Sequence, residues 1–200
     1  MNSGVRNYIL VTAAYWGFTL TDGALRMLVL LPFYGLGYSP FQLAQLFLFY
    51  EVFGIVTNLV GGWIGARLGL KGTLFAGLGL QVVALAALSR FNSDWPIVMG
   101  VAYVMGSQAL SGIAKDLTKL SAKSAIKVLV TDGNHGALFK WVAALTGSKN
   151  ALKGLGFFLG GFLLSWLGFS VALITMAACL GAILLAAVVS LPGNIGQTKA

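Results

Sequence analysis

Polar residues recur at every fourth position through one stretch of the chain, and most of them are lysines. The members of this stripe are Ser107, Ser111, Lys115, Lys119, Lys123 and Lys127. Because residues four apart lie on one face of an α-helix, their side chains should form a single stripe. Lys149 and Lys153 repeat the same spacing in a later apolar segment. Lysine binds phosphate groups as a point charge, so this pattern favours the binding of an anion.

The same lysines also fit a purely structural interpretation. Cytoplasmic loops of membrane proteins collect Lys and Arg, so the end of a helix in water would carry them as well. If this helix begins at Pro96, a rise of about 1.5 Å per residue puts Lys115 about 28 Å along it, at the inner edge of the hydrocarbon. Lys123 and Lys127 would then lie in water as a solvated helix end. The remaining candidates for one anion-binding vestibule are Ser111, Lys115, Lys119, Lys149 and Lys153.

Asp22, Arg26 and Glu51 fall inside apolar segments near the N-terminus. A charge near the centre of a bilayer costs about 2.5–3.5 kcal/mol, so these side chains should face the interior of a helix bundle. Asp22 precedes Arg26 by four residues, which is the favourable order for an ion pair within one helix. Arg26 is a further candidate for anion binding. Two interpretations of the acids remain open: a structural polar network, or a proton-coupling role for Asp22 or Glu51.

The composition of the chain sets the fold class. The 200 residues are 58% hydrophobic and only 9% charged, whereas a soluble domain has about 25% charged residues. We therefore expect an all-α membrane protein, and spans of about 20 residues leave room for about six of them. Residues 1–200 should form a single six-helix bundle. The expected helices cover about 8–31, 41–65, 73–88, 96–120, 147–167 and 171–191.

Basic residues alternate between the expected loops. The N-terminal segment, the turn at 66–71 and the segment between the fourth and fifth helices carry Arg or Lys, whereas the turns after the first and fifth helices carry none. The positive-inside rule then predicts a multi-pass protein of the inner (plasma) membrane with both termini in the cytoplasm. The net charge of +8 reports this orientation, and we expect no nucleic-acid partner because the basic residues flank apolar spans.

Sequence motifs for catalysis or metal binding are lacking. The chain has one histidine, His135, without Cys or Glu at metal-ligand spacing, and it has neither a Gly-x-Ser-x-Gly motif nor a Walker-type loop. We therefore expect no enzymatic activity, no cofactor and no metal site.

The turn after the second expected helix resembles a motif of the major facilitator superfamily. Its sequence is Gly62-Trp-Ile-Gly-Ala66-Arg67-Leu-Gly69-Leu-Lys71, and the family pattern is Gly-x-x-x-Asp-Arg-x-Gly-Arg-Lys. Gly62, Arg67, Gly69 and Lys71 match this pattern. Ala66 stands where the family has an acid, which puts the family's conformational latch through that acid in doubt.

A second motif supports the same resemblance. Gly156-Phe-Phe-Leu-Gly160-Gly161 is similar to the family's antiporter motif Gly-Pro-x-x-Gly-Gly, with Phe157 in place of proline. The resemblance implies the N-terminal half of a major facilitator fold, built as two three-helix inverted repeats. It also implies a second six-helix half, from the same gene product or a separate chain, because the family's site lies between two halves.

Longer strings resemble the arsenic-resistance permeases that export 1-arseno-3-phosphoglycerate. These strings are Tyr15-Trp-Gly-Phe-Thr-Leu-Thr-Asp-Gly-Ala-Leu-Arg26, Leu110-Ser-Gly-Ile-Ala-Lys-Asp-Leu-Thr-Lys119 and Thr146-Gly-Ser-Lys-Asn-Ala-Leu-Lys153. The resemblance covers the N-terminal half of those permeases. It implies proton-coupled efflux of a small organic anion, and a functional link to the glyceraldehyde-3-phosphate dehydrogenase that forms the arseno-ester from arsenate.

Three alternatives remain open. The cargo could be another organophosphate anion carried by the same architecture. The chain could be a truncated membrane fragment without transport activity. Asp22-Gly-Ala-Leu-Arg26 also resembles the start of the Asp-Gly-x-x-Ala-Arg box of membrane-embedded phosphatidyltransferases, although the spacing is one residue short and no later Asp-x-x-x-Asp pair follows.

Overall fold

The computed structural model describes residues 3–129 and 135–191, and this part of the chain is helical apart from short turns. The expected all-α class is therefore confirmed. The helices are α1 (Ser3–Gly35), α2 (Pro40–Leu46), α3 (Leu48–Leu88), α4 (Ile97–Leu129), α5 (His135–Leu167) and α6 (Phe169–Ser190).

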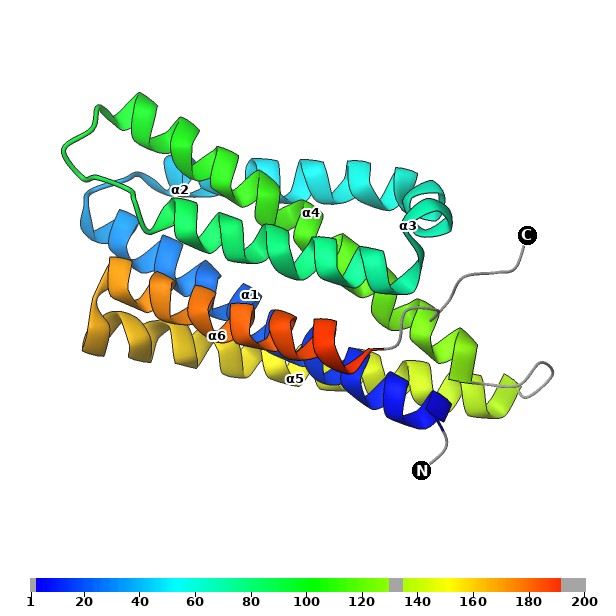
Figure 1. The fold of residues 1–200 in the computed structure, drawn as a ribbon. Coiled ribbons are helices and arrows are strands. Elements are labelled where there is room, and N and C mark those ends of the chain that lie inside the picture. Colours follow the sequence, from blue (N-terminus) through cyan, green and yellow to red (C-terminus); the bar gives the residue numbers. More distant parts are fainter. Residues whose placement is uncertain (1–2, 130–134, 192–200) are drawn as a thin grey trace.

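The helix α3 contains a sharp reversal at Gly69. This residue has φ 66° and ψ −179°, a conformation that glycine adopts without the steric cost of a Cβ atom. Figure 1 shows the chain running out along the first part of α3 and returning beside it after this point. The two helices expected at 41–65 and 73–88 are thus two arms of one helical segment, preceded by the short helix α2. Ser39 caps α2 in a reciprocal pair of hydrogen bonds with Gln42.

Several helices are longer than the apolar segments that predicted them. The helix α4 continues to Leu129 rather than ending near 120, and α5 begins at His135 rather than near 147. The sequence Thr131-Asp-Gly-Asn-His-Gly136 is typical of a loop; residues 131–134 lie outside the described residues, whereas His135 and Gly136 belong to α5. Hydropathy marks where a helix leaves an apolar environment, not where its backbone hydrogen bonds stop, and this is the reason for both differences.

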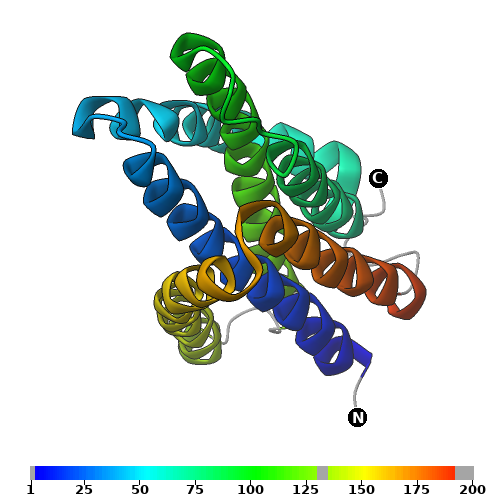
Figure 2. The same ribbon diagram turned by 90° about the vertical axis from the view of Figure 1, so that its left-hand side faces the viewer.

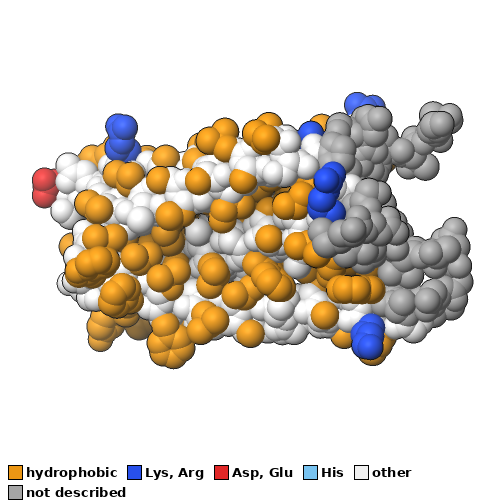
Figure 3. All heavy atoms as spheres, turned by 60° about the horizontal axis from the view of Figure 1, so that its bottom comes forward, with side chains coloured by type: hydrophobic (Ala, Val, Ile, Leu, Met, Phe, Trp, Pro, Cys, Tyr) orange, Lys and Arg blue, Asp and Glu red, His pale blue; other side chains and the backbone are white. Residues whose placement is uncertain are grey.

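The outer surface is that of a membrane protein. Within residues 3–129 and 135–191, four segments are long and apolar enough to cross a bilayer, namely Pro40–Leu88, Ile97–Ile126, Phe139–Leu167 and Phe169–Ser190. Large apolar side chains on these segments are exposed, such as Leu59 (81%), Phe158 (81%) and Val189 (86%). Figure 3 shows hydrophobic side chains along the flank of the molecule, with most of the visible Lys and Arg side chains towards one end.

Both described ends of the chain and the Gly69 reversal lie at one end of the bundle (Figure 1). The turns at 36–39, 89–96 and Gly168 lie at the opposite end. Figure 2 shows α5 on one side of α1, and α3 and α4 on the other side. The helix α1, which carries Asp22 and Arg26, therefore lies between the two helices that carry the cavity lysines, α4 and α5.

Glycines bring α1 and α5 into backbone contact. A Cβ atom on Gly156 would lie 2.6 Å from the carbonyl oxygen of Leu20 and 3.0 Å from the Cα atom of Gly23. A Cβ atom on Gly160 would overlap the carbonyl oxygen of Ala24, whereas one on Gly161 would meet no atom within 4 Å. Two of the three glycines of the second motif thus serve helix packing, as small residues do in membrane bundles.

Substitution of Gly160 tests this contact. Gly160→Ala should lower the free energy of unfolding by about 1–3 kcal/mol, because the added methyl group forces α1 and α5 apart. Gly161→Ala is the matched control and should cause no loss, since its side chain enters open space. The measurement is thermal or denaturant unfolding of the purified protein in detergent, and equal losses in the two variants would contradict the assignment.

Candidate anion-binding site

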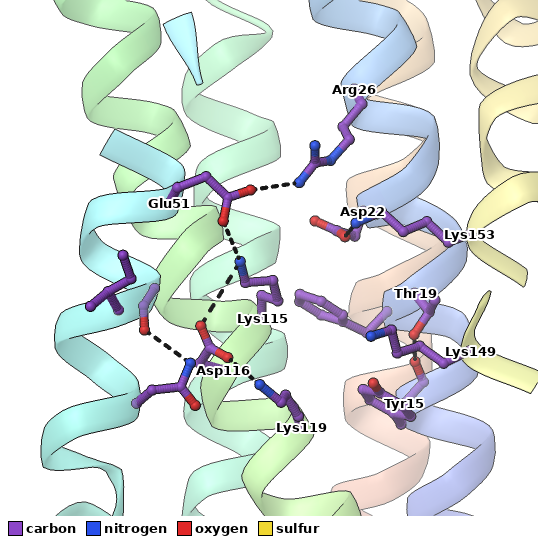
Figure 4. A pocket seen from close by; sticks show the side chains of 14 residues that line it. Tyr15, Thr19, Asp22, Arg26, Glu51, Lys115, Asp116, Lys119, Lys149 and Lys153 are labelled. Atoms are coloured by element: carbon purple, nitrogen blue, oxygen red, sulfur yellow. Dashed lines mark hydrogen bonds and ion pairs between the residues drawn. The ribbon is translucent and has the colours of Figure 1, made fainter. Parts of the chain in front are cut away.

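A cavity of about 360 Å³ lies between α1, α3, α4 and α5. Its lining includes five cationic side chains and three carboxylates (Figure 4). The cations are Arg26, Lys115, Lys119, Lys149 and Lys153, and the carboxylates are Asp22, Glu51 and Asp116. The cations exceed the carboxylates by two, which gives the cavity a net positive charge that concentrates anions.

Glu51 bridges two cations from different helices. The guanidinium Nη2 of Arg26 donates to Glu51 Oε1 at 3.0 Å, and Lys115 Nζ lies 3.4 Å from Glu51 Oε2. The ring of Tyr50 lies against both cations, 4.7 Å from Arg26 Cζ and 4.1 Å from Lys115 Nζ. The carboxylate group thereby ties α1, α3 and α4 together, although 57% of the Glu51 side chain is exposed to the cavity side.

Asp22 is buried and finds its partners on other helices. Tyr50 Oη donates to Asp22 Oδ1 at 2.6 Å, and Lys153 Nζ lies 3.6 Å from Asp22 Oδ2. The ion pair between Asp22 and Arg26, expected within one helix, is not formed between these two described side chains. That expectation was wrong because α3, α4 and α5 bring opposite charges to both side chains, and the sequence spacing gives no information on those neighbours.

Asp116 is a member of the site that the sequence analysis missed. Its side chain is 1% exposed, with Lys119 Nζ at 3.2 Å from Oδ1 and Lys115 Nζ at 3.9 Å from Oδ2. Among the described residues, no donor makes a hydrogen bond to Oδ2. A signal was present in the sequence, because Asp116 precedes Lys119 by three residues on an apolar helix and so lies beside it.

The four lysines expected in one vestibule do line one cavity. Lys115 lies near the middle of α4 and pairs with Glu51 of α3, and α4 continues past it to Leu129. Lys149 makes no ion pair with any residue that the structure describes.

Ser111 does not line the cavity. Its hydroxyl group donates to Gln81 Oε1 at 2.6 Å, and both side chains are buried between α3 and α4. A four-residue spacing turns by about 40° at each step around a helix, so the stripe drifts away from the cavity towards Ser111. The side chain of Lys127 lies outside the described side chains, and Lys123 is exposed.

The residues of the first motif lie at the Gly69 reversal, away from the cavity. Arg67 Cζ stacks 4.4 Å from the ring of Trp63, and Lys71 Nζ donates to the carbonyl oxygen of Leu191 at 2.7 Å. Leu191 follows α6 directly, where a cation is favourable for the helix dipole. A Cβ atom on Gly62 would meet no atom within 4 Å. Through Lys71, this motif connects the end of α6 to the turn in α3.

No protein-family model matches the chain, and no curated protein or solved structure matches it either. All-helical architecture, membrane-type surface and a cationic cavity are the features that the geometry establishes.

The carboxylates of Asp22 and Glu51 should contribute unequally to the free energy of unfolding. Asp22→Ala leaves the buried Tyr50 hydroxyl group and Lys153 without their partner, and hydrogen bonds to charged groups contribute about 1.5–3 kcal/mol. Glu51→Ala removes an exposed carboxylate, for which about 0–1 kcal/mol is expected. Unfolding in detergent measures both. A larger loss for Glu51→Ala would contradict the burial argument, and a double-mutant cycle with Tyr50→Phe isolates the Asp22–Tyr50 hydrogen bond.

Proposed function

We propose that the chain is the N-terminal half of a secondary transporter of the major facilitator type, and that it exports 1-arseno-3-phosphoglycerate in arsenate resistance. The observation that carries the proposal is the cavity between α1, α3, α4 and α5, in which five cations outnumber three carboxylates. A phosphorylated, arsenylated three-carbon acid carries several negative charges, and lysine and arginine are the side chains that bind such oxyanions.

The carboxylates hold the cations in place while the cavity is empty. Arg26 and Lys115 share Glu51, Lys153 pairs with Asp22, and Lys119 pairs with Asp116. An arriving oxyanion takes over some of these cations, and the released carboxylate becomes available for a proton. Alternating access then requires a second six-helix half that closes the open side of the cavity, in the same polypeptide or in a separate chain.

The orientation follows the distribution of basic residues. With both termini in the cytoplasm, the end of the bundle that carries the Gly69 reversal faces inwards, and α4 and α5 extend their lysines towards it. A cargo formed in the cytoplasm by a glyceraldehyde-3-phosphate dehydrogenase then meets the lysines first. The surrounding partner is the lipid bilayer of the inner membrane.

A phosphatidyltransferase is less well supported. That chemistry needs carboxylates grouped around metal ions, whereas Asp22 is engaged by Tyr50 and Lys153. Within the described ranges, no three His, Cys, Asp or Glu side chains come together at distances suited to a metal ion.

Transport in everted membrane vesicles tests the cargo. The chain is expressed together with the second half encoded by its own or the adjacent reading frame, and the arseno-ester is generated in the assay from arsenate by glyceraldehyde-3-phosphate dehydrogenase. We expect uptake of arsenic into everted vesicles only when the dehydrogenase and its substrates are present, with phosphoglycerate transported poorly. Equal transport of phosphoglycerate would favour a general organophosphate carrier, and no transport of either would favour a non-transporting fragment.

Coupling to protons is tested at the two candidate acids. Glu51→Gln and Asp22→Asn keep the shapes of the side chains, so the proteins should still fold, but neither side chain can exchange a proton. We expect proton-driven flux to be lost in at least one variant, while exchange of labelled cargo across the membrane at equal pH persists. Full proton-driven flux in both variants would retire the coupling role and leave these acids as structural partners.

A further inference from the structure

A second, smaller hollow adjoins the cavity. Its volume is about 100 Å³, and it is lined by Tyr15 of α1, by Lys119 and Lys123 of α4, and by Leu145, Thr146 and Lys149 of α5. Tyr15, Lys119 and Lys149 also line the larger cavity. The two spaces are therefore neighbours that share one wall, and Lys123 belongs to the smaller one alone.

The lysines of the smaller hollow have fewer carboxylate partners than the cations of the larger cavity. Of its three lysines, only Lys119 pairs with a described carboxylate, that of Asp116. Lys123 and Lys149 make no ion pair within residues 3–129 and 135–191. In the larger cavity, by contrast, Arg26, Lys115 and Lys153 each have a carboxylate partner. The net positive charge is thus concentrated at the smaller hollow, where the electrostatic attraction for an anion is strongest.

The walls of the smaller hollow are held by contacts between helices. Trp16 Nε1 of α1 donates to Ser148 Oγ of α5 at 3.0 Å, next to Lys149. Leu145 is buried one turn before Lys149, so this part of α5 is packed against the bundle. Tyr15 and Thr146 add side chains with hydroxyl groups to the lining. Lys119, Lys123 and Lys149 are consequently presented by fixed helices rather than by a loop.

We propose that the smaller hollow is a separate anion subsite that takes a single tetrahedral oxyanion of the phosphate or arsenate type. Its volume is less than a third of that of the cavity, which suits one oxyanion group rather than a three-carbon compound with an oxyanion at each end. The role of this subsite as the first binding site of a transported cargo rests on the proposed function. Its ability to bind an oxyanion does not depend on that function. Lys119 and Lys149 line both spaces and can pass the oxyanion from one to the other.

This assignment gives Lys123 a role that the sequence analysis did not. We interpreted it there as part of a solvated helix end. Its exposure agrees with that interpretation, but Lys123 also lines the smaller hollow together with Lys119 and Lys149, and in the proposed subsite it binds the oxyanion with them.

Binding of inorganic phosphate to the purified full chain, in detergent or nanodiscs, tests the subsite by calorimetry. Lys123→Gln should weaken phosphate binding about five- to tenfold, and Lys123→Arg should largely restore it because the charge is kept. Lys140→Gln is the matched control, since Lys140, on α5, is exposed like Lys123 and lines neither space. Circular dichroism verifies the helical content of each variant.

Two results would overturn the proposal: wild-type protein that binds no phosphate, or Lys123→Gln and Lys140→Gln proteins with the same affinity. An equal loss in both variants would indicate general electrostatic attraction instead of a site.

Transport measurements on the same variants distinguish a failure of the subsite from a failure of the proposed function. If the chain transports, Lys123→Gln should raise KM severalfold with kcat nearly unchanged, because the larger cavity is intact. Transport with an unchanged KM and unchanged phosphate affinity would remove the subsite and leave the function standing. Phosphate binding that depends on Lys123, in a protein that transports nothing, would keep the subsite and remove the transporter assignment.

Discussion

The structure depends on the requirement that charges inside an apolar helix bundle be paired. Seven of the eight charged side chains around the cavity meet an opposite charge, and most of these partners come from another helix. Near the centre of a bilayer a charge costs about 2.5–3.5 kcal/mol, and an opposite charge offsets part of that cost. The partners therefore fix which faces of α1, α3, α4 and α5 point inwards.

Close helix packing and charge pairing are two aspects of one arrangement. A Cβ atom on Gly23 would lie 2.6 Å from the carbonyl oxygen of Lys153, so α1 and α5 touch at the residue whose side chain reaches Asp22. A larger residue at Gly23 or Gly156 would move Lys153 away from its partner. On the other side, a Cβ atom on Gly54 would come within 2.8 Å of Asp116 Oδ2, so the absence of a side chain there leaves room for the buried carboxylate.

Hydrophobic content and spacing were sufficient to predict the all-α class, the apolar part of each long helix and the lysines that share a cavity, but not the separate short helix α2. These features follow from single-helix geometry. The partner of each charge did not follow, because it depends on how helices pack. Asp22 therefore pairs with Lys153 and Tyr50 instead of Arg26, and Ser111 turns to Gln81. The spacing of Asp116 to Lys119 indicates their pairing, but it does not show that the carboxylate is buried beside the cavity.

The balance of charge connects the pairing to the proposed cargo. Three carboxylates leave an excess of two positive charges in the larger cavity, so an anion with two negative charges completes neutrality without removing any carboxylate. A cargo with a third negative charge exceeds that balance, and the protonation of one carboxylate would restore it. Glu51, which is exposed to the cavity and shared by Arg26 and Lys115, is the carboxylate that an oxyanion would displace with the least rearrangement of the bundle.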